Sequence, residues 1–205
     1  FFTNTLSKRK ETKWDDNEDE DGVARGWINA EDGEGDYPIQ CLLELCGPNG
    51  YSFNFKAISF FSVLARLGKE LNPFDEEEVR GGLLIEDEQG YNTLKCLTKC
   101  SHSSYDDNHQ QLVDNVFLTL LIRLRQMGLL KKEDIREYNL FLKLFYKSYS
   151  SGRRRIQFLI EWDPTLLVQT DDDGWLPLHW ASQFTESIQA FQDLFEYGII
   201  YYPNK

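Results

Sequence analysis

Apolar residues recur every three or four positions along five stretches of the chain, which is the spacing of an amphipathic helix. These stretches are residues 55–71, 113–127, 135–149, 153–162 and a region that begins at Ile188. The fourth should end before Asp163-Pro164, because proline disfavours helical backbone at the preceding residue. The pattern predicts an all-α fold in which neighbouring helices cover each apolar face. In the last stretch the apolar positions are Ile188, Phe191, Leu194 and Phe195.

Three short segments align without gaps, and an apolar stretch follows each of them. They are residues 32–39, 87–94 and 171–178. In each, glycine follows aspartate by three residues, and proline or threonine follows three residues later, before isoleucine or leucine. The shared positions are Asp32, Gly35, Pro38 and Ile39, then Asp87, Gly90, Thr93 and Leu94, then Asp171, Gly174, Pro177 and Leu178.

This motif predicts a turn that leads into a helix. Glycine can adopt a left-handed conformation without Cβ strain, and aspartate can accept hydrogen bonds from nearby backbone N–H groups. Pro38 and Pro177 suit the first helical position, where a missing N–H costs nothing, and Asn92 can cap the second copy. Together with the helix that comes next, each unit is a turn and two helices that must stack on a neighbour.

The third copy and the residues after it resemble the ankyrin repeat signature, Asp-x-x-Gly-x-Thr-Pro-Leu-His-x-Ala. The matching residues are Asp171, Gly174, Pro177, Leu178, His179 and Ala181. The resemblance implies a solenoid of helix pairs joined by short turns, with a concave binding face of turn tips and inner helices. It also implies that His179 is structural and bonds neighbouring turns. The chain is likewise similar to divergent ankyrin-like families of some unicellular algae.

The spacing of the copies departs from that family. The turn glycines stand at positions 35, 90 and 174, at intervals of 55 and 84 residues, whereas a regular ankyrin period is about 33 residues. The first two copies have Gln40 and Lys95 at the histidine position, and the signature threonine is absent from all three. We therefore expect an irregular solenoid over residues 27–205, with an unmarked unit near residues 135–149.

The two ends of the chain differ from this pattern. Residues 1–26 are expected to be a charged, disordered tail, because a basic cluster at 8–10 and an acidic run at 15–21 bury too little apolar area to order themselves. The closing stretch at 197–203 is apolar. It is expected to lack its next repeat, as in a truncated chain.

The net charge of −12 argues against nucleic acid and anionic membranes as partners, since binding to phosphate depends on Lys and Arg. Acidity favours solubility and, weakly, a basic partner. No apolar run approaches the ~20 residues that a membrane-spanning helix needs. The cysteines are sparse and lie in apolar stretches, which indicates a reducing intracellular compartment, cytoplasmic or nuclear. They are Cys41, Cys46, Cys96 and Cys100.

No constellation of residues predicts catalysis, a cofactor or a metal. Cys96 and Cys100 lack the Cys-x-x-Cys spacing of a zinc knuckle, so the thiols are interpreted as small hydrophobes. His179 has Ser182 nearby, but no nucleophile elbow surrounds that serine. Gly81-Gly82 is too short to cradle a phosphate.

The basic run at residues 153–155 opens a predicted helix, where positive charge opposes the helix dipole. A solvated basic patch is the favoured interpretation. The alternatives are contact with an acidic partner or with the chain's own acidic run.

The candidate partner-binding residues lie at the turn tips. Asp36, Tyr91 and Trp175 follow the turn glycines, and Asp172 lies in the third turn. Tyr and Trp are favoured interface anchors, and packing of both rings on adjacent turns is an equal alternative. The sequence predicts a non-catalytic interaction module that binds an unidentified protein partner. The alternatives are a scaffold subunit, with self-association, and a regulatory fragment of an enzyme.

Overall fold

The computed structural model describes residues 39, 55–71, 80–86, 90–98, 107–145, 152–184 and 188–204. Every regular element in these ranges is helical, and none is a strand. The predicted all-α class is therefore confirmed for the part of the chain that the structure describes. The expected tail at residues 1–26 lies outside it, as does the first motif copy except Ile39.

Four of the five predicted helical stretches form single helices. α3 (Phe55–Leu71) and α8 (Arg153–Trp162) match at both ends, and α10 (Ile188–Tyr201) begins at the predicted residue. α5 (Asp107–Gln126) starts earlier than predicted and ends one residue before Met127. The remaining elements are α4 (Thr93–Leu97), α6 (Lys132–Glu137), α7 (Leu140–Lys143), the 3-10 helix η3 (Pro164–Val168) and α9 (Pro177–Phe184).

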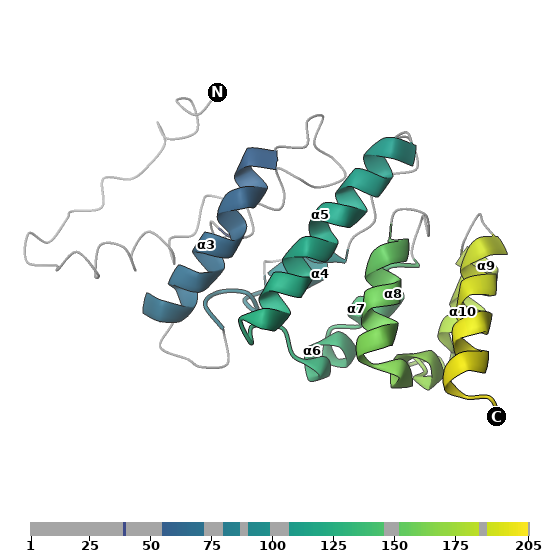
Figure 1. Cartoon of the computed structure of the whole chain (residues 1–205). Helices are drawn as coiled ribbons and strands as arrows, with labels where there is room; N and C mark the ends of the chain where they lie inside the picture. The colour runs from purple at the N-terminus through teal and green to yellow at the C-terminus, as the bar shows by residue number, and fades with distance from the viewer. Residues whose placement is uncertain are drawn as a thin grey trace, which may run out of the picture.

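The longer helices lie in a row along the molecule in the order α3, α5, α8 and α10, and the shorter α4, α7 and α9 lie behind them (Figure 1). α5 contacts both α3 and α8, and η3 contacts both α8 and α10. α9 and α10 contact each other and form the end of the row. One buried core runs from Phe61 in α3 through Leu121 and Ile156 to Leu194 in α10.

The backbone of α3 packs directly against the backbone of the turn at residues 80–84. This is possible because each of the two segments has a glycine at the contact, Gly68 in α3 and Gly81 in the turn. A Cβ placed on Gly68 would lie 2.5 Å from the carbonyl oxygen of Gly81. Gly81 itself has a φ of +69°, in the left-handed region that glycine favours. The Gly81-Gly82 pair thus lets a turn pack tightly against α3, a role that the sequence pattern did not indicate.

The prediction of one continuous helix over residues 135–149 is wrong. The described part of that stretch forms α6 and α7, which are separated at Asn139. Asn139 has φ +50° and ψ +36°, a left-handed conformation that asparagine tolerates better than most residues with a side chain. This conformation turns the chain after α6. Residues 146–149 lie outside the described ranges.

Candidate protein-interaction surface

The turn of the third motif copy is organised by the carboxylate of Asp171. One oxygen accepts hydrogen bonds from the backbone N–H groups of Asp173 (3.0 Å) and Trp175 (2.8 Å), and the other accepts from the indole Nε1 of Trp180 (2.6 Å). Burial of the carboxyl opposes its charged form, but these hydrogen bonds outweigh that effect and hold the pKa of Asp171 below its usual value. The predicted role of the motif aspartate is therefore confirmed in this copy.

The other residues of this copy also occupy their predicted positions. Gly174 has a φ of +80°, and Pro177 is the first residue of α9. The Nδ1 of His179 accepts the backbone N–H of Leu176 (3.0 Å), which satisfies a donor at the start of α9. This bond joins His179 to its own turn, whereas the resemblance implies a bond to a neighbouring turn. Ala181 is buried in the core.

The described residues of the second motif copy, from Gly90 onward, share the left-handed glycine and the helix start but have different supporting contacts. Gly90 has a φ of +75°, and the side chain of Asn92 caps α4 by accepting the backbone N–H of Lys95 (2.9 Å). The ammonium of Lys95 pairs with Glu86 and donates to the carbonyl of Gly90 (2.7 Å). Thr93 is buried at the start of α4. The motif residues outside the described ranges are Asp32, Gly35, Asp36, Pro38 and Asp87.

The aromatic residues predicted at the turn tips are half-buried. The ammonium of Lys143 lies over the ring of Tyr91, 5.4 Å from its centroid. Trp175 makes an edge-on contact with Trp180, with ring centroids 6.4 Å apart. Packing within the chain therefore covers part of each ring, and partner binding by these residues stays a prediction. Asp172 is exposed to solvent.

The basic run that opens α8 is only partly a solvated patch: Arg153 and Arg154 are exposed, but the prediction is wrong for Arg155. Arg155 is completely buried, and its guanidinium donates to Oδ1 of Asp114 (2.8 Å) and to the carbonyl of Leu97 (2.7 Å). The other oxygen of Asp114 accepts the backbone N–H of Arg154 (2.8 Å). Asp114 therefore places a negative charge at the N-terminus of α8, where the helix dipole favours it.

The remaining two arginines of this run link α8 to its neighbours. Arg153 donates two hydrogen bonds to the carboxylate of Asp193 in α10, at 2.7 and 3.1 Å. Arg154 donates to the side-chain oxygen of Asn115 in α5 (2.6 Å). The run is thus a set of internal contacts that fix α5, α8 and α10 relative to one another.

α10 presents an apolar stripe to solvent. The stripe consists of Ile188, Phe191, Phe195 and Ile199, which follow one another at helical spacing and are all exposed. The exposed fractions of Ile188, Phe195 and Ile199 are 75%, 53% and 54%. Of the four apolar positions that the sequence assigned to this helix, only Leu194 is buried. We call the four exposed residues the α10 stripe.

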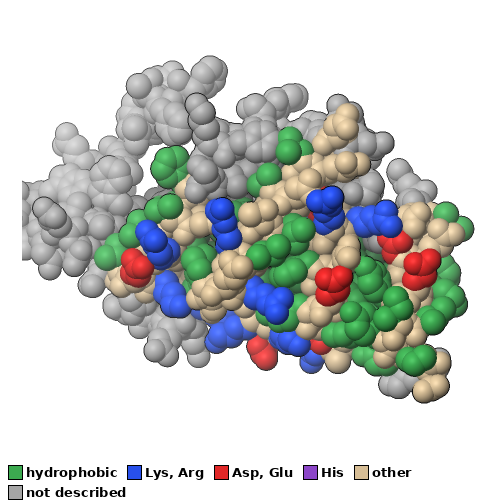
Figure 2. Space-filling view, viewed as in Figure 1, with side chains coloured by type: hydrophobic (Ala, Val, Ile, Leu, Met, Phe, Trp, Pro, Cys, Tyr) green, Lys and Arg blue, Asp and Glu red, His purple; other side chains and the backbone are tan. Residues whose placement is uncertain are grey.

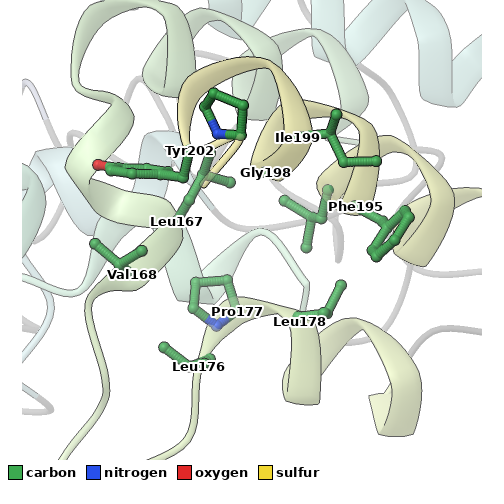
Figure 3. Close-up of a pocket in the computed structure, with 11 residues that line it drawn as sticks. Leu167, Val168, Leu176, Pro177, Leu178, Phe195, Gly198, Ile199 and Tyr202 are labelled. Carbon is green, nitrogen blue, oxygen red and sulfur yellow. The ribbon is translucent and has the colours of Figure 1, made fainter. Parts of the chain in front are cut away.

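A groove of about 310 Å³ lies beside the α10 stripe (Figure 3). Leu167 and Val168 of η3, Leu178 of α9, and Phe195 and Ile199 of α10 form its walls. Figure 2 shows apolar side chains gathered at the end of the molecule that α9 and α10 form. The groove is large enough for a small ligand, but it lacks the convergent polar groups with which pockets orient substrates.

The described ranges contain neither a candidate metal site nor a candidate membrane-spanning helix. They contain no group of three or more His, Cys, Asp or Glu residues placed to hold a metal ion. Cys96 is a half-buried thiol packed against the core, and the other three cysteines lie outside the described residues. None of the described helices combines the length and the apolar character needed to cross a membrane.

Comparison with known proteins finds no match for this chain among family models, curated proteins or solved structures. The candidate site is therefore defined by geometry. A partial signal for its exposed stripe was present in the sequence, because apolar residues cover more of the circumference of α10 than its polar residues do, and the helix contains no Lys or Arg. An apolar arc that is wider than the usual core-facing stripe needs more than one neighbour to cover it.

Proposed function

We propose that the chain is a non-catalytic protein-interaction module with an ankyrin-like helical-repeat architecture. It binds a helical segment of a protein partner at the end of the row formed by α9 and α10. The observation that carries the proposal is the α10 stripe together with the groove beside it. A contiguous exposed apolar surface is a mark of interaction sites, whereas single exposed apolar residues are ordinary.

The shape and chemistry of the groove favour a helix as the bound element. Its walls are helices, and the described part of the chain has no strand edge to which an extended peptide could add. An amphipathic helix binds such a groove through apolar anchors at positions i, i+3 or i+4, and i+7. Leu178, Phe195 and Ile199 offer apolar contacts along the two walls.

The ankyrin-like assignment is supported by the described parts of the second and third motif copies. Gly90 and Gly174 both have left-handed backbone conformations, and a helix begins three residues after each of them. α9 and α10 then pack together as a pair at the end of the row. The extra elements α6, α7 and η3 lie between the second and third copies, in the longer of the two intervals. The few cysteines suit an intracellular location, cytoplasmic or nuclear.

Selection of helical peptides on the full chain tests this function. A phage-displayed library of amphipathic helices is selected on the immobilised protein, and binding of the enriched peptides is measured by fluorescence anisotropy. We expect enriched peptides to share apolar residues at i, i+3 or i+4, and i+7. Phe195→Glu should weaken the binding of these peptides at least about tenfold, because it puts a charge into the apolar contact.

Leu112→Glu on α5 is the matched control, since Leu112 is also exposed but lies outside the groove. It should leave the peptide affinity unchanged. Trp175→Ala in the same assay tests the predicted turn-tip contact. Failure to enrich peptides over a scrambled library, or equal affinity for Phe195→Glu, would contradict a binding function at this surface.

A further inference from the structure

We infer that the occupant of the α10 stripe is a second copy of this chain, packed through its own α10 in the antiparallel direction across a two-fold axis. This inference rests on the proposed function, because it names the partner for the same surface. Three observations lead to it: the spacing of the stripe, its lack of charge, and the orientation of its two phenylalanine rings.

The spacing of the stripe is self-complementary. Ile188, Phe191, Phe195 and Ile199 are distributed almost symmetrically about the level of Asp193, just before the middle of α10. A two-fold axis at that level reverses the second helix, so that Ile188 faces Ile199 of the second copy and Phe191 faces its Phe195. An isologous interface requires this kind of reciprocal match.

The charge distribution favours an apolar partner over a polar one. Asp193 and Glu196 are the charged residues of α10. Asp193 is paired with Arg153 on the side of α10 that faces α8, and Glu196 lies outside the α10 stripe. The stripe itself contains no charged residue, so contact between two stripes buries no charged group that belongs to them. The absence of Lys and Arg from α10 also disfavours an anionic membrane, which interfacial helices bind through such residues.

The two phenylalanine rings of the stripe lie parallel to each other and in contact. The rings of Phe191 and Phe195 are stacked, with centroids 6.2 Å apart and planes 7° from parallel. A two-fold contact would bring the two phenylalanines of each copy together, and contacts between aromatic side chains stabilise an interface beyond the area that they bury. The rings already contact each other in the single chain, so less side-chain freedom is lost on association.

The size of the surface sets the expected strength. α10 has 14 residues and is therefore about 21 Å long at 1.5 Å per residue. A contact along one such helix is smaller than the ~800 Å² per partner of a standard interface. We expect a reversible dimer with a dissociation constant in the micromolar range, which must be measured over a wide range of protein concentration.

Sedimentation velocity and light scattering on the full chain test the inference. Between about 5 and 500 µM, the mass should rise from that of the 24.0 kDa chain towards twice that value. Phe195→Glu should raise the dissociation constant at least about thirtyfold, because each dimer would bury two unpaired carboxylates. Leu112→Glu should not change it. Far-UV circular dichroism verifies that both variants are folded.

A charge-pairing experiment tests the register. Phe191→Lys and Phe195→Glu should each be largely monomeric alone, but an equimolar mixture should form a heterodimer, because the lysine introduced in one variant faces the glutamate introduced in the other. A monomer at every concentration, a dimer unaffected by Phe195→Glu, or no recovery in the mixture would overturn the inference. If the chain is monomeric yet still binds selected helical peptides through Phe195, the inference fails and the proposed function stands. If it neither dimerises nor binds such peptides, both fail.

Discussion

Arg155 and Asp114 form a buried ion pair between α8 and α5, and breaking it tests how α8 is held on the core. The exposed fractions of the two side chains are 0% and 3%. Arg155 also donates to the carbonyl of Leu97, and its guanidinium lies 5.3 Å from the ring centroid of Phe117. Arg155→Met retains an aliphatic side chain in the same space but removes all the polar contacts.

The expected loss of stability follows from the groups that remain. In Arg155→Met, the carboxylate of Asp114 stays buried without its guanidinium, and the carbonyl of Leu97 loses its charged donor. Removal of one partner of a buried ion pair costs about 3–5 kcal/mol, against a total stability of about 5–15 kcal/mol for a typical domain. We expect a decrease of about 3–5 kcal/mol in the free energy of unfolding. Asp114→Leu should have a similar effect, because it also removes the acceptor at the N-terminus of α8.

The double variant separates the interaction energy of the ion pair from the other effects of each single substitution. Arg155→Met with Asp114→Leu removes both charges, so neither is left uncompensated in the core. The decrease in its free energy of unfolding should be smaller than the sum of the decreases in the two single variants, by at least about 1 kcal/mol. It should remain less stable than the parent chain, because the carbonyl of Leu97 and the backbone N–H of Arg154 still lack these partners.

Urea unfolding, followed by circular dichroism and by tryptophan fluorescence, measures these differences from midpoints and slopes. Arg154→Met is the matched control, because Arg154 is exposed and keeps its backbone bond to Asp114 after the change. Arg154→Met should lower the free energy of unfolding by less than about 1 kcal/mol. Single losses below about 1 kcal/mol at Arg155 and Asp114, or losses that simply add in the double variant, would refute the reasoning.

Three further predictions concern local structure. Gly68→Ala should lower the stability by about 2 kcal/mol or more in urea unfolding, although alanine favours helices, because its Cβ would collide with the carbonyl of Gly81. Gly174→Val should lower the melting temperature through its left-handed backbone, whereas Gly198→Ala in α10 should leave it equal or higher. Asp171→Asn should destabilise the chain at pH 7; since the folded pKa of Asp171 is lowered, the difference from the parent chain should persist down to about pH 4 and vanish as the pH falls further.

The helices that the sequence predicted best are those whose ends carry a local signal. α8 ends before Asp163-Pro164, where the proline restricts the preceding residue, and α9 begins at Pro177. The break between α6 and α7 has no such signal. Asn139 sits among apolar residues at helical spacing, and a single left-handed residue does not disturb that pattern. The apolar periodicity therefore predicted helical structure in this stretch but did not reveal that Asn139 interrupts it.

The role of the basic run could not be derived from its own neighbourhood. Arg155 is separated from Asp114 by 41 positions, and only the packing of α8 on α5 brings them together. A partial signal was nevertheless available, because Asp114 lies on the apolar face of α5 beside the buried Val113 and Phe117. An acid at a core position requires a buried partner, and the basic run supplies it.

The same limit applies to the apolar face of α10. Helical spacing identified Phe191, Leu194 and Phe195 as apolar positions, but it does not specify which side of the helix the rest of the chain covers. Packing against α9 and η3 buries Leu194 and leaves the two phenylalanines exposed. Burial of an apolar face is thus a property of its neighbours, and an apolar position left uncovered is informative about binding.

The distribution of charge changes how the acidity of the chain bears on binding. The net charge is −12, but the described residues contain as many Lys and Arg as Asp and Glu, so the excess of acid belongs to the rest of the sequence. Attraction of a basic partner would therefore act through those other residues and would be screened by salt. Contact at the α10 stripe is apolar, so its affinity should change less than about threefold between about 0.05 and 0.5 M NaCl. A steep decrease in dimer or peptide affinity with salt, measured by sedimentation or anisotropy, would show that charge rather than the α10 stripe drives the association.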